Sequence, residues 1–320
     1  GTYKISNVLY IPSNVTIELK DGVTIKKTMK TNSKQMQPSG GIFELLEPSK
    51  AAKKGVHGKY NGVHNVKIYS IGKAVIDQAY KGKDGQNCIG LVMCHNKNIT
   101  IDGITFKNIK YGHFIEMDAS NNVVVNNCTF TGYKSSKRHT SEAINLDTPD
   151  KKTKGFTHDW SKYDCTANKN VKITNCTFSN LEKAIGTHQY SVKKYHTNIT
   201  ISDCTIKNCV SGAIEMMNWK NISLNNIKFI NIGKNSTAMP GSARRPPCSP
   251  PRTGSTPTKV LSSPLRSSAG RWEKSMQERV CRFRPRKFSA NAGSLEAVPS
   301  VIWQNFPGIR TSCPTLLPLM

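Results

Sequence analysis

Three polar residues of this chain have the types and spacing of a catalytic group. They close three similar short segments: Phe114-Ile-Glu-Met-Asp118, Ala143-Ile-Asn-Leu-Asp147 and Ala184-Ile-Gly-Thr-His188. If these segments are stacked strands, Asp118 and Asp147 would lie about 5 Å apart, with His188 on the next strand. Two close carboxylates raise the pKa of one of them, which gives an acid beside a base. Such a pair cleaves glycosidic bonds, and His188 would orient a group or relay a proton.

A second interpretation needs no catalysis. Outward positions of a strand are commonly polar, so the three side chains could align without function. If the face is functional, we expect further residues near it to bind substrate: Glu116, Glu142, Arg138, His158, Trp160, Lys183 and Glu215. His113 is a further flanking residue.

Two insertions are expected to cover this face. The first, residues 131–141, carries Arg138, whose fork of donors suits a carboxylate or sulfate. The second, residues 148–169, carries His158, Trp160 and Tyr163. The two aromatic side chains would serve either as platforms for sugar rings or as a small core of the loop itself.

The elements that position these residues follow from a repeat. Five copies of one apolar pattern begin at Asn98, Asn122, Asn170, Asn198 and Asn221. A period near 24 residues with apolar residues at alternate positions is typical of a β-solenoid, in which equivalent side chains stack between turns. A sandwich of hairpins would explain the alternation but not the fixed offsets. We therefore predict an all-β fold, a parallel β-helix.

The repeat also predicts which residues stack in the core. One column holds Phe106, Phe130, Phe178, Ile206 and Phe229. Another holds Cys128, Cys176 and Cys204, which we interpret as small buried apolar residues. The ten cysteines contain no CxxC pair, and no metal site is predicted from their spacing. Four asparagines at the ends of repeats are expected in left-handed turns: Asn108, Asn180, Asn208 and Asn231.

Composition divides the chain into two parts. The net charge of +26 comprises +16 in residues 1–237 and +10 in residues 238–320, where arginine replaces lysine and proline rises from 4 to 12 residues. We predict a β-helix domain over residues 1–236, truncated at both ends, and an irregular tail over residues 237–320. The tail is interpreted as non-native sequence, a disordered arm or, least favoured, a nucleic-acid-binding segment. The lysine-rich solenoid would attract an anionic partner.

The chain contains no run of about 20 apolar residues, so no membrane span is predicted.

Over residues 1–236 the chain resembles the pectate-lyase-like superfamily of right-handed parallel β-helices. The resemblance is carried by the repeats and by the segments Gly1-Thr-Tyr-Lys-Ile5 and Ile11-Pro-Ser-Asn-Val-Thr-Ile17. That resemblance implies a secreted or cell-surface protein that acts on a polysaccharide. Oligomeric state is not predicted.

Within that superfamily, the layout of the face is similar to polygalacturonases. The resemblance implies that Asp118, Asp147 and His188 act as acid, base or helper. Glu215-Met-Met217 stands where that family has Arg-x-Lys, and the second aspartate of its Asp-Asp pair is absent, so galacturonate specificity is not implied.

Three functions follow as expectations. The first is glycosidic hydrolysis, which requires no cofactor or metal. The second is a lyase acting on a uronate-containing polymer, in which Lys183 or Arg138 would be the base, with calcium as a cofactor. The third is a non-catalytic β-helix that binds glycans or acts as a surface adhesin.

Overall fold

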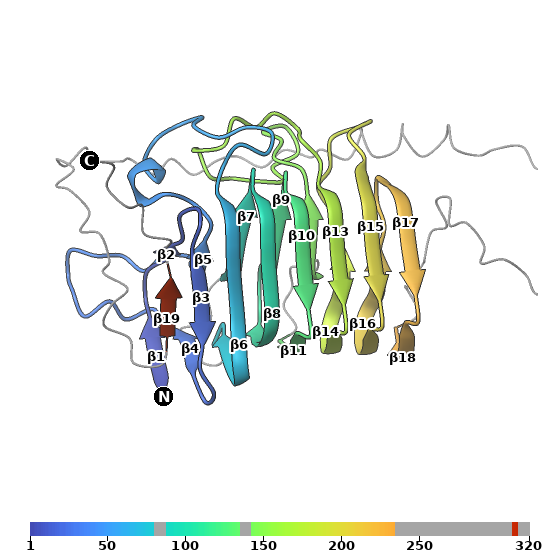
Figure 1. Ribbon diagram of the computed structural model, residues 1–320, viewed down its shortest axis with the longest axis horizontal. Helices are drawn as coiled ribbons and strands as arrows, with labels where there is room; N and C mark the ends of the chain where they lie inside the picture. Colours follow the sequence, from blue (N-terminus) through green and yellow to red (C-terminus); the bar gives the residue numbers. More distant parts are fainter. Residues whose placement is uncertain (80–87, 135–141, 234–308, 313–320) are drawn as a thin grey trace, which may run out of the picture. The chain divides into compact units, whose positions relative to one another are not determined.

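The computed structural model describes residues 1–79, 88–134, 142–233 and 309–312. The chain forms two units, residues 1–244 with 300–320 and residues 245–299, and every described residue belongs to the first. The predicted fold class is confirmed: this unit is an all-β, right-handed parallel β-helix (Figure 1).

Parallel pairing arranges the strands in three ladders. The repeat wall contains β3 (Thr16–Leu19), β6 (His64–Asp77), β8 (Lys97–Ile109), β10 (Asn121–Asn126), β13 (Lys169–Thr174), β15 (His196–Ser202) and β17 (Trp219–Asn225). The phenylalanine wall contains β1 (Thr2–Ile5), β4 (Thr24–Lys27), the second halves of β6 and β8, β11 (Thr129–Tyr133), β14 (Thr177–Gly186), β16 (Thr205–Glu215) and β18 (Lys228–Ile232). The charged wall contains β2 (Leu9–Tyr10), β5 (Gly41–Glu44), β7 (Ile89–Cys94), β9 (Ile115–Asp118), β12 (Glu142–Asp147) and the ends of β14 and β16.

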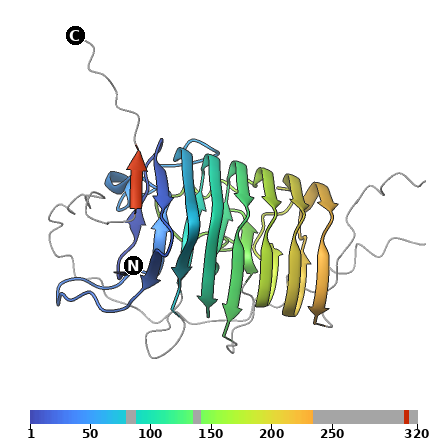
Figure 2. The same cartoon turned by 60° about the horizontal axis from the view of Figure 1, so that its bottom comes forward.

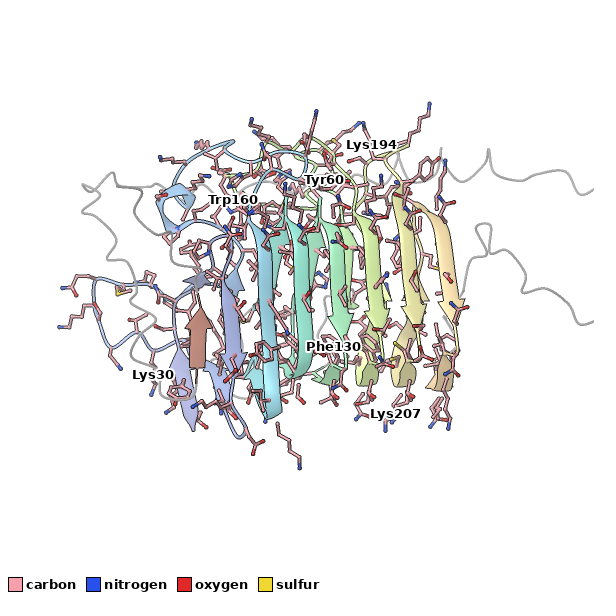
Figure 3. All side chains as sticks on the ribbon, in the orientation of Figure 1. Lys30, Tyr60, Phe130, Trp160, Lys194 and Lys207 are labelled. Carbon is pink, nitrogen blue, oxygen red and sulfur yellow. The ribbon has the colours of Figure 1, made fainter. Side chains whose placement is uncertain are left out.

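The core is built of like residues stacked on like, as the repeat predicts. Phe130 pairs with Phe106 on one side and Phe178 on the other. Its ring centroid lies 5.1 Å from that of Phe106 and 4.8 Å from that of Phe178, with the planes 11° and 9° from parallel. Figure 3 places Phe130 within the stack of strands. Burial of each such ring stabilises the fold by about 2–3 kcal/mol.

The cysteine column is buried and all seven cysteines of the described residues are free thiols. Asparagines hold the turns: the predicted left-handed conformation is confirmed at Asn108, Asn180, Asn208 and Asn231 (φ 68°, 56°, 53° and 51°). A second line of asparagines joins neighbouring turns at the start of the repeat. There Asn122 donates to Asn98 and Asn198 to Asn170, with N–O distances of 2.9 and 2.8 Å. Each turn therefore supplies the hydrogen-bond partner of the next.

The two ends of the described solenoid differ. At the first end, the strand β19 (Ile309–Ser312) pairs antiparallel with β3 (Figure 2). The tail is predicted to be irregular; these four residues form a strand, and the rest of it lies outside the described residues. At the other end, Leu224 is 39% and Phe229 51% exposed, as expected of a last turn without a covering layer. A single short helix, the 3-10 turn Pro48–Lys50, occurs in the described residues.

Candidate functional site

The charged wall brings the three predicted residues together. Asp118 pairs directly with Asp147 in the ladder of β9 and β12. The backbone N–H of His188, two residues after β14, donates to Oδ1 of Asp147 at 3.0 Å, and so does that of Gln189. Nδ1 of His188 lies 3.5 Å from the other oxygen, Oδ2. Positions 29 and 41 residues apart are therefore neighbours because consecutive turns stack in register.

The two aspartates are nevertheless buried. Asp118 is 0% and Asp147 1% exposed, so the prediction that they stand on a solvent-facing surface is wrong. Their side chains point away from the solenoid core, as strand alternation requires, but the chain covers them. On the outer side of the charged wall, Cys94 and Ala119 form a second apolar cluster with Phe156 and other residues. Strand alternation predicted the direction of the side chains but could not predict this cover.

Trp160 explains how the second insertion is fixed to the wall. It is 2% exposed and belongs to the second apolar cluster, so it is part of the loop's own core and is not a platform for sugars. Its Nε1 donates to Oε1 of Glu44 at 2.7 Å, and Nδ1 of His158 lies 2.7 Å from the same oxygen. Figure 3 shows Trp160 among the loops at one edge of the strands. His158 pairs with Glu44, and its predicted role in binding substrate stays a prediction.

Glu44 escaped the sequence analysis. It is buried at the end of β5, two rungs from Glu116 through Val92. Its segment, Gly41-Ile-Phe-Glu44, lies outside the recognised repeats. Only the pairing of β5 with β7 places Glu44 on the charged wall, and the sequence pattern alone does not predict that pairing.

The accessible part of the wall is a network of opposite charges. Nζ of Lys183 lies 3.2 Å from Oε1 of Glu142 and also pairs with Glu215, whose side chain is 36% exposed. Gly186 lies beside both carboxylates: a Cβ there would meet Glu215 Cβ at 3.0 Å and Glu142 Cγ at 3.1 Å. The absence of a side chain at Gly186 therefore leaves the space in which these carboxylates meet Lys183. Glu116, on the preceding rungs, is partly exposed.

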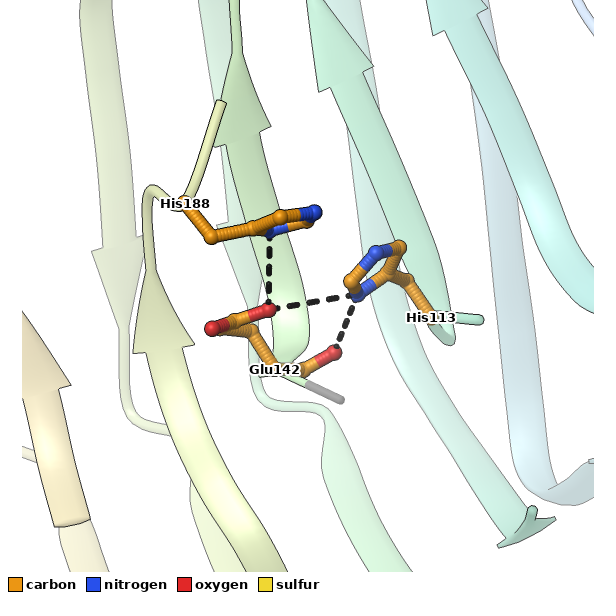
Figure 4. Close-up of side chains that lie close together, drawn as sticks. All are labelled: His113, Glu142 and His188. Atoms are coloured by element: carbon orange, nitrogen blue, oxygen red, sulfur yellow. Dashed lines mark hydrogen bonds and ion pairs between the residues drawn. The ribbon is translucent and has the colours of Figure 1, made fainter. Parts of the chain in front are cut away.

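His113, Glu142 and His188 form a cluster at the centre of this network (Figure 4). Nδ1 of His113 donates to the backbone carbonyl of Glu142 at 2.8 Å. Oε2 of Glu142 lies 3.2 Å from Nδ1 of His188 and 3.8 Å from Nδ1 of His113. The side chain of His188 is 24% exposed, whereas Glu142 is fully buried. The three residues come from three consecutive turns.

Burial and neighbouring charges raise the pKa of three carboxyl groups of the charged wall, those of Glu116, Asp118 and Asp147. Burial, reinforced by the charge of Asp147, raises the pKa of Glu116 to about 7. Burial also raises the pKa of Asp147 to about 6, although His188 opposes this rise. For Asp118, burial and then the charges of Glu116 and Asp147 raise the pKa well above its ordinary value. The protonated form of each of these carboxyl groups is therefore more favoured than that of an exposed carboxyl group.

In the histidine cluster the pKa of the carboxyl group of Glu142 is lowered instead of raised. Burial alone would raise its pKa, but contact with His188 and the charge of His113 lower it to about 2. Burial would lower the pKa of His188, yet its contacts with Glu142 and Asp147 raise it to about 9. Burial lowers the pKa of His113 to about 4. Groups with such large shifts concentrate at functional sites.

Two predictions lie beyond these observations. Arg138 falls in residues 135–141, outside the described residues, so its role in binding substrate stays a prediction. The catalytic roles of Asp118, Asp147 and His188 stay predictions as well.

Comparison with known proteins supports the parallel β-helix fold. No family model matches the chain. The plasmin and fibronectin-binding protein A of Streptococcus pneumoniae is 24% identical over 255 residues, which cover 72% of this chain and 33% of that protein. The crystal structure of PfbA, a surface adhesin of the same species, has a TM-score of 0.59 and 21% identity over 72% of this chain and 52% of that one. A second structure of the PfbA surface protein and adhesin gives a TM-score of 0.59 and 23% identity.

These similarities establish the parallel β-helix but not a superfamily, so the pectate-lyase-like assignment remains a prediction. The chain spans one third of the length of its curated relative and about half of the solved chains. Among the described residues, no helix has the length and apolar character needed to cross a membrane.

Proposed function

We propose that this chain is the β-helix part of a surface-displayed protein that binds a polysaccharide along the charged wall. The observation that carries the proposal is the burial of Asp118 and Asp147, at 0% and 1% exposure. A polysaccharide cannot reach a buried pair, but it can reach Glu215, His188 and the exposed part of the wall. The similarity to a surface adhesin supports binding over cleavage.

The chemistry of the wall fits sugar hydroxyl groups. Carboxylates such as Glu215 accept hydrogen bonds from hydroxyls, and charge-assisted hydrogen bonds are about twice as strong as neutral ones. The charge of +16 on residues 1–237 would in addition attract an acidic polysaccharide from a distance. Binding would then weaken as salt is added, and more for an acidic polymer than for a neutral one.

The test is binding of the chain to a panel of neutral and acidic polysaccharides. We expect Glu215→Gln to weaken binding by about fivefold, the cost of one lost charge-assisted hydrogen bond. The matched control is Asp203→Asn, which removes one carboxylate charge from an exposed turn outside the charged wall and keeps the oxygen that accepts from Asn226. Equal affinities of the two variants, or no binding by the unaltered chain, would contradict the proposal.

Hydrolysis is the second candidate, and a specific observation favours it. Glu116, which is partly exposed, has a pKa raised to about 7 by burial and by the charge of Asp147, and this is the range in which a carboxylic acid can donate a proton at neutral pH. The same panel detects it through the release of reducing ends, and ultraviolet absorbance of an unsaturated product would identify a lyase. Release that is lost in Asp147→Asn would replace binding with hydrolysis as the function.

A further inference from the structure

The cluster of His113, Glu142 and His188 has a chemistry that polysaccharide binding does not use. One candidate ligand atom of each residue lies within 4.8 Å of the other two. Among the described residues, this is the group of histidine and acidic side chains close enough to hold one ion. Two histidines with one carboxylate are a ligand set of zinc and of other first-row divalent metals.

The separations fit a shared ion. Ligands about 2.1 Å from a tetrahedral zinc ion lie about 3.4 Å from one another. Nδ1 of His188 lies 3.2 Å from Oε2 of Glu142 and 3.5 Å from Oδ2 of Asp147. These three atoms are buried, yet none has a hydrogen-bond partner in the described part of the chain. Their lone pairs are therefore not aligned on one another, which suits atoms that converge on a common centre.

In Glu142, Asp147 and His113, the second oxygen or nitrogen of the side chain already contacts another group of the protein. Lys183 occupies Oε1 of Glu142, and two backbone N–H groups occupy Oδ1 of Asp147. The backbone carbonyl of Glu142 accepts from Nδ1 of His113, which leaves Nε2 of that ring as the ligand atom. Such outer contacts orient the ligands of metal sites and set the tautomer of a ligating histidine.

Electrostatics also favours a cation. In the described part of the chain, the carboxyl groups of Glu142, Asp147 and Glu215 lie around the cluster and pair with the ammonium of Lys183 and with the ring of His188. A divalent ion would neutralise this excess of acidic groups. The nitrogen ligands select against calcium, which takes oxygen ligands. The sequence does not predict a metal site at these three residues because they are 29 and 46 positions apart and no spacing motif joins them.

We propose that His113, Glu142 and His188 bind one divalent transition-metal ion, with zinc as the favoured ion and the carboxyl group of Asp147 beside His188. The site lies on the charged wall, where the ion would hold three consecutive turns together. It shares His188 with the proposed polysaccharide surface, but a titration with the metal alone tests it without a polysaccharide, so its failure would leave the proposed polysaccharide binding standing.

The test uses the full chain after treatment with a chelator and alkylation of its thiols, titrated with zinc and with cobalt. We expect one ion per chain and, for cobalt, a visible spectrum of nitrogen and oxygen ligation without the ultraviolet band of thiolate ligation. His188→Gln should weaken affinity at least tenfold, roughly the effect of losing one ligand. Its position is partly exposed, so the variant is expected to fold.

The matched control is His64→Gln, which removes a histidine of the repeat wall outside the cluster and should leave affinity unchanged. His113→Gln is the second variant, and its fold is checked by circular dichroism before titration. Equal affinities of the unaltered chain and His188→Gln would overturn the proposal, as would a complete absence of binding. In those cases His188 acts instead as a protonated partner of Glu142.

Discussion

The repeat wall and the charged wall are built from the same turns but follow different rules. In the repeat wall, like residues stack on like: Val123 lies between Ile99 and Val171, and Asn122 donates to Asn98. In the charged wall, the outward positions carry mostly unlike residues, apart from the pair of Asp118 and Asp147. Its column from Glu116 continues through Asn145 and Gly186 to Glu215.

The difference shows how stability and function are separated in a solenoid. A column of identical residues gains the same contact at each turn, so its energy is distributed along the stack. A column of unlike residues gains no such repetition, but it places unlike chemical groups about 5 Å apart. The second insertion packs against the charged wall through Phe156 and Trp160, and on this wall Asp118 is buried whereas His188 is partly exposed. Mutations in the two walls should therefore differ in what they affect.

The largest effect is expected for Phe130→Ala in the phenylalanine wall. The ring is fully buried between two stacked rings, and removing it leaves a cavity in the central column. We expect the free energy of unfolding to fall by about 3–5 kcal/mol. Chemical denaturation followed by circular dichroism measures this change.

The control for Phe130→Ala is Phe229→Ala in the last turn, where the same side chain is 51% exposed. The fall in unfolding free energy for Phe229→Ala should be less than half that for Phe130→Ala, because the exposed ring buries less apolar surface. Equal losses at the two positions would show that the stack does not concentrate its stability in the middle.

The next effect is a pH dependence at His196, where β15 begins. The ring is fully buried, burial lowers its pKa to about 3, and its Nδ1 accepts from the backbone N–H of Asn168 at 3.0 Å. In the unfolded chain the imidazole takes up a proton below about pH 6.5, whereas the folded chain stays neutral there. Stability is therefore lost as pH falls from 7 toward 3, by about 2 kcal/mol at pH 5.

His196→Asn removes the titrating group and keeps an acceptor for Asn168. Its unfolding free energy should fall by about 2 kcal/mol less than that of the unaltered chain between pH 7 and pH 5. A chelator in both samples removes any contribution from a bound ion. Parallel pH profiles would show that His196 is protonated in the folded state.

The sequence predicts the contacts of the repeat and phenylalanine walls more completely than those of the charged wall. The columns of Val123 and Phe130 and the left-handed turn at Asn108 follow from residue type and period, because local conformation and strand register determine them. The neighbours Asp118 and Asp147 were also predicted, since they lie on consecutive turns with equal alternation.

The cover over that wall could not be predicted. Whether Trp160 faces solvent depends on Glu44, which is 116 residues away and accepts its N–H. The same insertion packs on Ala119, the residue after the buried Asp118. Such contacts are set by tertiary packing of irregular segments, which have no period from which their partners can be read.

The smallest effect tests the asparagine turns of the repeat wall. Asn170 has a φ of 54°; its side chain donates to Oδ1 of Asn121 and accepts from Asn198. Alanine and glycine both lose these hydrogen bonds, but only alanine is strained at a positive φ. We expect Asn170→Ala to be about 1 kcal/mol less stable than Asn170→Gly in thermal or chemical unfolding. At Lys172, on the exposed face of the same strand without a positive φ, the order should reverse because glycine weakens a strand. The same order at both positions would mean that the turn conformation contributes nothing of its own, and that the repeat's asparagines stabilise the fold through their side-chain hydrogen bonds alone.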